Sequence, residues 1–130
     1  MKFYILPVLI LFSSLNLVSQ SINWVTMDKA LELQKNTPKN IMIDIYTTWC
    51  GPCKMLDKNT FTNKDLITFV NANYYAVKFN AEGNESVNYK NRLFENPNYD
   101  PAKAKRRNSA HQFSQYLGVR AYPTIVFLDD

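Results

Sequence analysis

A pair of cysteines, Cys50 and Cys53, stands between an apolar run and a helix start. The run, residues 41–47, is rich in β-branched side chains, which is typical of a strand buried on both faces of a sheet covered by helices. Pro52 is tolerated in a helix only near its beginning, so a helix should start around Cys50. This order predicts an α/β fold, in which functional sites gather beyond the carboxyl ends of strands.

Apolar residues at helical or strand spacing predict further elements along the chain. They are a helix at 27–36 capped by Thr26, a helix capped by Asn63, a strand at 73–80, a helix around 113–117 capped by Asn108 or Ser109 and ended by Gly118, and a strand at 124–128. Residues 81–108 break this pattern and predict a long connection with one irregular helical turn at 89–94. We interpret the basic group at 103–107 as a solvated surface segment, with a partner-docking loop as the alternative.

Residues 1–19 have the layout of a secretory signal peptide. Lys2 supplies a positive start, residues 3–12 form an apolar run, and a polar stretch leads to a cleavage site near Ser19. The run is shorter than the roughly 20 apolar residues that a membrane span needs, so we expect no stable membrane span after leader cleavage. An uncleaved anchor is the alternative. The mature domain, residues 20–130, is expected outside the cytoplasm, where disulfides persist.

The chain contains only these two cysteines. A framework of structural disulfides would need more cysteines at wider spacing, so we interpret the pair as a site. A helix N-terminus favours an anion, so Cys50 should ionise readily and attack a disulfide, while Cys53, more shielded, resolves the mixed disulfide. Half of a zinc site is the alternative, but His111 is the only histidine and lies far along the chain. We therefore expect no metal, and no cofactor besides the redox-active Cys50–Cys53 disulfide.

The charge balance does not point to a polyanionic partner. The formal net charge is +4, and one of the positive charges, Lys2, belongs to the predicted leader. Aromatic residues are plentiful, but no recognisable RNA- or DNA-binding motif accompanies them. We therefore expect no nucleic acid partner.

The sequence WCGPCK at residues 49–54, directly after an apolar strand, resembles the active-site signature of the thioredoxin family. The resemblance spans residues 22–130 and implies a thioredoxin-like α/β fold with a central mixed sheet flanked by helices. It also implies that Trp49 forms an apolar wall beside the reactive cysteine, and that Gly51 and Pro52 set the helix start and tune the redox potential. Residues 46–48 and 59–61 look more like exported bacterial members of the family, which implies a location in the bacterial periplasm.

Positions outside this motif also match the family. Asp44 stands where thioredoxins carry a buried carboxylate, and Lys78 matches its partner in the next strand. Burial should raise the pKa of Asp44, which can then accept the Cys53 proton; a purely structural pair with Lys78 is the alternative. Tyr122 and Pro123 resemble the loop with a cis proline that faces the cysteines and pairs with extended substrates, an ordinary trans proline being the alternative.

The chain departs from the family pattern in two places. Residues 82–108 replace a short connection, so we treat them as an insertion. The sequence ends at Asp130, where thioredoxins continue into one more antiparallel strand and a final helix. We therefore expect a domain that lacks these last elements, with an exposed apolar edge strand and reduced stability.

Taken with the resemblance, these features predict a protein-disulfide reductase. Its expected partners are disulfide-containing exported proteins as substrates and an upstream thiol as electron donor. The Gly-Pro pair between the cysteines resembles that of reducing thioredoxins more than that of oxidases, which implies reduction rather than oxidation. The alternatives are a disulfide oxidase or isomerase, a binding or chaperone module that keeps the fold without turnover, and a metal carrier.

Overall fold

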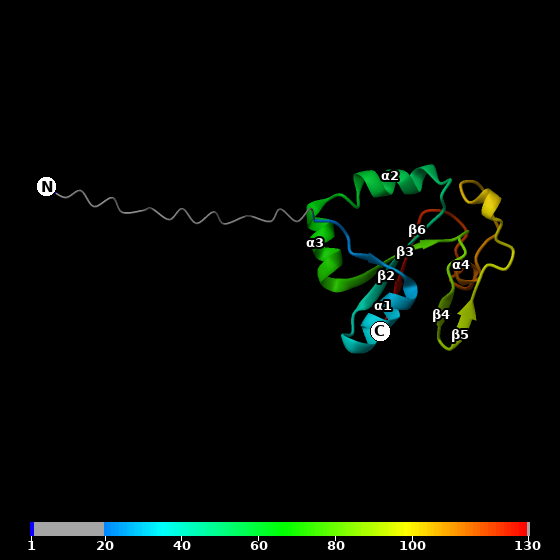
Figure 1. Cartoon of the computed structure of the whole chain (residues 1–130), viewed down its shortest axis with the longest axis horizontal. Helices are drawn as coiled ribbons and strands as arrows, with labels where there is room; N and C mark the ends of the chain where they lie inside the picture. The colour runs from blue at the N-terminus through cyan, green and yellow to red at the C-terminus, as the bar shows by residue number, and fades with distance from the viewer. Residues whose placement is uncertain (2–19, 130) are drawn as a thin grey trace.

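A four-stranded sheet forms the centre of the molecule (Figure 1). The computed structural model describes residue 1 and residues 20–129, so the predicted leader lies outside the described residues except for Met1. In sheet order, the strands are β1 (Trp24–Val25), β3 (Tyr74–Asn80), β2 (Asn40–Tyr46) and β6 (Thr124–Leu128). The first three are parallel, and β6 runs antiparallel to β2. The predicted mixed sheet is therefore confirmed.

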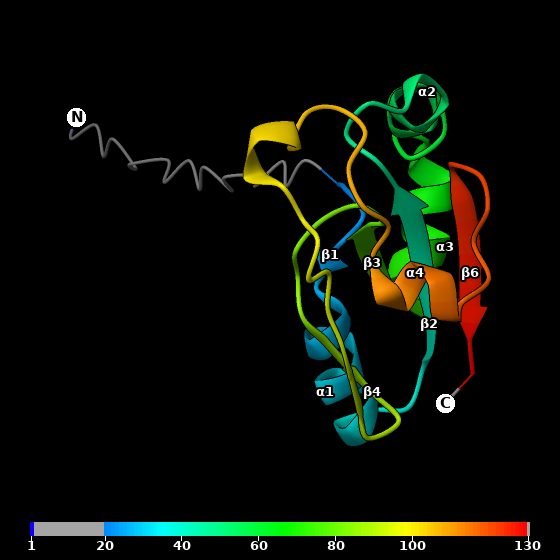
Figure 2. The same cartoon turned by 90° about the vertical axis from the view of Figure 1, so that its right-hand side faces the viewer.

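Helices cover both faces of this sheet. They are α1 (Met27–Asn36), α2 (Gly51–Asn59), α3 (Lys64–Asn73) and the short α4 (Gln112–Tyr116). Figure 2 shows α3 behind β2 and α4 in front of it, with α2 beyond the end of β2. The predicted N-caps are confirmed: Thr26 accepts the N–H of Lys29, and Asn63 accepts the N–H of Leu66.

Successive side chains of β2 point to opposite faces of the sheet, so this strand contributes to a hydrophobic cluster on each face. Ile41, Ile43 and Ile45 are fully buried in a cluster that includes residues of α1 and α4. Met42 packs in a second cluster with residues of α3. Asp44 shares the face of Met42, so this carboxyl group points to the side of the sheet on which α3 lies.

The prediction of a helical turn at 89–94 is wrong, because these residues belong to a β-hairpin. Strand β4 (Val87–Tyr89) pairs antiparallel with β5 (Arg92–Phe94), and Val87 lies opposite Phe94 with both side chains buried. Lys90 and Asn91 form the turn, with φ angles of 50° and 60°. A single 3-10 turn, η1 (Pro101–Lys103), follows the hairpin.

The predicted cap of the last helix is also wrong by two to three residues. Helix α4 begins after His111, whose Nδ1 accepts the N–H of Phe113 at 3.0 Å. The other ring nitrogen, Nε2, lies 2.6 Å from the carbonyl oxygen of Glu85, which ties the helix start to the segment before β4. Burial lowers the pKa of His111, so the neutral imidazole is favoured.

Gly118 follows α4 with a φ of +71°, as expected for a residue that ends a helix. Gly118→Ala should lower the free energy of unfolding by about 1–2 kcal/mol, because an L side chain is strained in this conformation. Gly51→Ala is the matched control, since an added Cβ meets nothing within 4 Å at either glycine and only Gly118 has a positive φ. Urea denaturation of both variants checks this; equal losses would contradict it.

Strand β6 has a neighbour on one side only within the described residues, as predicted for an edge strand. Its Phe127 is 56% exposed and packs against Tyr74, with ring centroids 5.3 Å apart.

In residues 20–129, none of the helices combines the length and apolar character that crossing a membrane requires.

Candidate active site

The two cysteines lie at the start of α2 and are joined by a disulfide. Cys50 is the N-cap of this helix, and the backbone N–H of Cys53 donates to the Cys50 sulfur at 3.1 Å. Pro52 occupies the first turn, where its missing N–H costs no helical hydrogen bond. The predicted helix start is therefore confirmed, and a backbone N–H that has no acceptor within the helix donates to the Cys50 sulfur.

The expectation that Cys53 is more shielded than Cys50 is wrong by exposed area, since each residue is only 3% exposed. The Cys50 sulfur is bonded to Cys53 and accepts the N–H of that residue in the first turn of α2. The two cysteines differ instead in what they face, because only Cys50 lines the neighbouring cleft.

This cleft has a volume of about 440 Å³ and is built from three separate parts of the chain. They are residues 49–52, the segment 82–108 through Glu82 and Arg107, and residues 120–122 before β6. The peptide bond between Tyr122 and Pro123 is cis, as the family resemblance implies. The structure thus brings Tyr122 to the same cleft as Cys50.

Trp49 is more than an apolar wall of this cleft. Its indole N–H donates to Glu82 Oε2 at 2.7 Å, its ring packs edge-on against Tyr122, and the Arg107 guanidinium lies 4.7 Å from its ring centroid. The same Glu82 oxygen also accepts the backbone N–H of Asn108 at 2.9 Å. Glu82 and Asn108 were not predicted as parts of the site, and Arg107 was considered only within the basic group at 103–107.

The segment 82–108 is attached to the site at a second point. The hydroxyl of Thr48, two residues before Cys50, donates to the carbonyl oxygen of Ala104 at 2.7 Å. This contact and those of Glu82 fix the segment beside the loop that joins β2 to α2. The segment therefore shapes the surroundings of the disulfide directly.

Asp44 and Lys78 form an ion pair beneath the surface, directly opposite each other in neighbouring strands. Lys78 Nζ donates to Asp44 Oδ2 at 2.6 Å, whereas Asp44 Oδ1 is buried and accepts no hydrogen bond from the described residues. Burial raises the pKa of Asp44, and the attraction of Lys78 offsets only part of that rise. The predicted direction of this shift is confirmed.

A second carboxylate, Asp57, also pairs with Lys78. Asp57 lies on α2 four residues after Cys53, so the two share one face of that helix. Burial alone would lower the pKa of Lys78, but the hydrogen bonds and charges of Asp44 and Asp57 outweigh it and raise the pKa. The spacing after Cys53 was a signal for Asp57 that the sequence analysis did not use.

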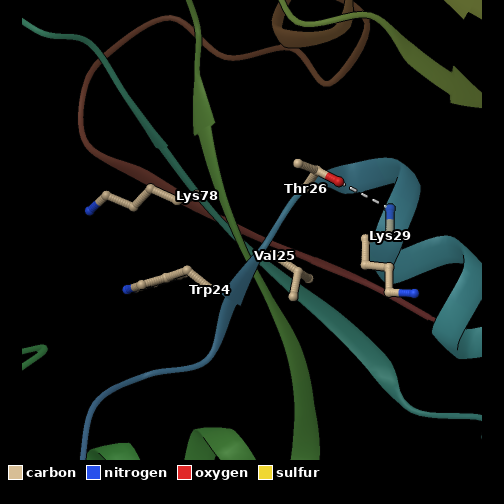
Figure 3. A pocket seen from close by; sticks show the side chains of 5 residues that line it. All are labelled: Trp24, Val25, Thr26, Lys29 and Lys78. Atoms are coloured by element: carbon tan, nitrogen blue, oxygen red, sulfur yellow. Dashed lines mark hydrogen bonds between the residues drawn. The ribbon is translucent and has the colours of Figure 1, made fainter.

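Aromatic rings surround the Lys78 ammonium in addition to the two carboxylates. Its Nζ lies 5.2–5.4 Å from three ring centroids, those of Trp24, Tyr46 and Phe61. Figure 3 shows Lys78 and Trp24 extending side by side from β3 and β1, whereas Lys29 lies on α1, on the other side of β1. Lys78, Trp24 and Lys29 all line a hollow of about 450 Å³. The Lys78 side chain is 22% exposed, whereas the Asp44 side chain is only 1% exposed.

The described residues contain no group of three or more histidine, cysteine, aspartate or glutamate side chains arranged to hold a metal ion. His111, the remaining candidate ligand from the sequence, uses both ring nitrogens in contacts with the backbone. Its position links α4 to the segment before β4.

Sequence comparisons show that this chain is similar to known redox proteins. The profile of a family described as "Thioredoxin-like domain" matches residues 27–130. The chain is 37% identical over 59 residues to the thiol:disulfide interchange protein DsbD of Campylobacter jejuni, a match that covers 45% of this chain and 10% of that protein. It is 40% identical over 43 residues to thioredoxin Y2, chloroplastic, of Arabidopsis thaliana, covering 30% and 26% of the two chains. The chain thus spans a minor part of the length of these relatives.

Solved structures with the same fold extend the comparison. A thioredoxin from Thermus thermophilus superimposes with a TM-score of 0.57 at 13% identity, over 82% of this chain and 64% of that one. A DsbH oxidoreductase gives a TM-score of 0.58 at 17% identity, over 92% and 73% of the two chains. At these identities the likeness shows a shared fold.

Proposed function

This chain belongs to the thioredoxin-like family of thiol–disulfide oxidoreductases, and from that premise we propose that it reduces disulfides of exported proteins through Cys50 and Cys53. The observation that carries the proposal is the position of Cys50, which caps α2, bonds to Cys53 and lines an open cleft. The signal-peptide layout of residues 1–19 supports export, with the bacterial periplasm as the destination.

The reaction starts from the dithiol form of the pair. The Cys50 thiolate attacks one sulfur of a substrate disulfide; the bond between the substrate sulfurs breaks, and the second substrate sulfur leaves with the electron pair and takes up a proton. Cys53 then loses its proton and attacks Cys50, which releases the first substrate thiol and forms the Cys50–Cys53 disulfide. Two electrons have passed to the substrate, and an upstream thiol donor restores the dithiol.

The surrounding residues have distinct roles in this proposal. The N–H of Cys53 and the positive end of α2 stabilise the Cys50 thiolate before attack. Asp44, held by Lys78, accepts the Cys53 proton directly or through water. The backbone of Tyr122, beside the cis bond to Pro123, pairs with the extended substrate, while Trp49 covers one side of the cleft.

The direction of electron flow is tested by equilibrating the protein with reduced and oxidised glutathione, together with an insulin-reduction assay. A reductase should give a potential closer to about −270 mV than to −120 mV and should precipitate insulin in the presence of dithiothreitol. A potential near −120 mV without insulin reduction would instead identify an oxidase and overturn the reductase proposal.

A further inference from the structure

Two arginines from separate segments line the cleft beside Cys50. Arg107 belongs to the segment 82–108, and Arg120 lies in the loop between α4 and β6; both side chains are exposed. Within residues 20–129, neither arginine forms an ion pair with a carboxylate. The one carboxylate that lines the cleft, Glu82, already accepts two N–H groups through Oε2.

Arg107 is held in place without losing its capacity to bind an anion. Its guanidinium lies 4.7 Å from the ring centroid of Trp49, and the indole N–H of Trp49 donates to Glu82 at 2.7 Å, which fixes the ring. A guanidinium resting on an aromatic face can still donate N–H groups in its own plane, in the fork geometry that suits a carboxylate. Ordering it beforehand lowers the entropic cost of binding.

Most of the charged groups around Cys50 are positive, although Glu82 also lines the cleft. Lys105 and Arg106 precede Arg107 on the same exposed stretch, and the positive end of α2 points at the cysteine sulfur. Exposed cations around a cleft raise the local concentration of acidic partners and speed their association. A disulfide flanked by acidic residues is therefore attracted to this cleft more strongly than one flanked by basic residues.

We propose that this cleft selects disulfides flanked by aspartate or glutamate, and that Arg107 and Arg120 are specificity-determining residues. The inference rests on the proposed disulfide exchange at Cys50 and names the class of substrate for it. A substrate strand that reaches Cys50 enters the cleft that both arginines line. There its acidic side chains can accept N–H groups from the arginines, whereas basic side chains are repelled.

The test uses three peptides of equal length with one disulfide each, flanked by aspartate, serine or lysine. Their kcat/KM for reduction is measured at low salt for the wild type, Arg107→Gln, Arg120→Gln and Arg107→Glu. The wild type should prefer the aspartate peptide over the lysine peptide by about tenfold, and each Gln variant should lose about three- to fivefold on the aspartate peptide alone. Arg107→Glu should reverse the preference, and 0.5 M salt should reduce it.

Arg92→Gln is the matched control. Arg92 is also an exposed arginine over an aromatic ring, 4.6 Å from the centroid of Phe94, but it lies on β5 and does not line the cleft. Its variant should behave like the wild type on all three peptides. Thermal unfolding of each variant shows whether the fold is retained.

The outcomes separate this inference from the proposed function. If all three peptides are reduced at equal rates by the wild type, disulfide reduction stands and the acidic preference is wrong. If Arg107→Gln slows all three peptides equally, Arg107 only positions Trp49, and the inference is again wrong. If the wild type reduces none of the peptides and no insulin, the proposed function fails and the inference falls with it.

Discussion

Replacing Cys50 with serine should lower the rate of disulfide reduction by about 10³-fold or more. A serine hydroxyl at the start of α2 receives the same N–H from Cys53, but it is a far weaker nucleophile and cannot form a mixed disulfide. Insulin reduction and the release of thiol from a disulfide peptide measure the loss. The fold should persist, because the disulfide closes a loop of only a few residues and contributes little to stability.

Cys53→Ser is the control that separates the two chemical steps. This variant keeps the attacking sulfur, so it should release one equivalent of substrate thiol and then remain as a mixed disulfide at Cys50. Mass spectrometry of the trapped species identifies the attached partner, in the native host as well as with peptides. If Cys50→Ser kept a tenth of the wild-type rate, or Cys53→Ser trapped nothing, Cys50 would not be the attacking residue.

Local sequence signals predicted most of the elements that hold the site. The caps at Thr26 and Asn63 work through short-range side-chain contacts, which depend on a few neighbouring residues. The hairpin at 87–94 was missed because its turn is made by Lys90 and Asn91, with no glycine to mark the positive φ angles. The start of α4 was misplaced because His111, an uncommon cap, accepts the N–H that marks it.

The residues of the cysteine motif and the Asp44–Lys78 pair were predicted as parts of the candidate site, but the contacts of the segment 82–108 were not. Cys50, Cys53 and Pro52 lie within one motif, and the family resemblance implied the pairing of Asp44 with Lys78, which lie opposite each other in neighbouring strands. The contact of Trp49 with Glu82 joins residues 33 positions apart. Nothing in the local sequence of the segment 82–108 fixes where it packs, so this contact and the placement of Arg107 required the three-dimensional structure.

Asp44→Asn should raise the free energy of unfolding at pH 7 by about 1–3 kcal/mol. The Asp44 carboxylate is fully buried, and among residues 20–129 only one of its oxygens accepts a hydrogen bond. The variant removes the cost of burying this charge, while the Lys78 ammonium keeps Asp57 as a partner. Asp57→Asn is the matched control, because the Asp57 side chain pairs with the same lysine but is 47% exposed. Its effect should stay below about 1 kcal/mol.

The gain from Asp44→Asn should depend on pH in a defined direction. Burial raises the pKa of Asp44 in the folded state above its usual value of 3.8, so the folded protein holds this proton more tightly than the unfolded chain. The contribution of Asp44 to stability is therefore fully present below pH 3.8 and is lost as pH rises through the raised pKa. The difference between variant and wild type should vanish at low pH and grow towards neutrality. Urea denaturation of the oxidised proteins at several pH values measures it.

The same substitution should slow the reaction at one step only. Without the Asp44 carboxylate, Cys53 lacks its proton acceptor, so resolution of the mixed disulfide should slow by about 10²-fold. The first release of substrate thiol, which depends on Cys50, should keep its rate, and Asp57→Asn should leave both steps nearly unchanged. Rapid-quench measurement of the two thiols in sequence distinguishes these steps. A variant that is less stable at pH 7, or that resolves the mixed disulfide at the wild-type rate, would mean that Asp44 serves only to pair with Lys78.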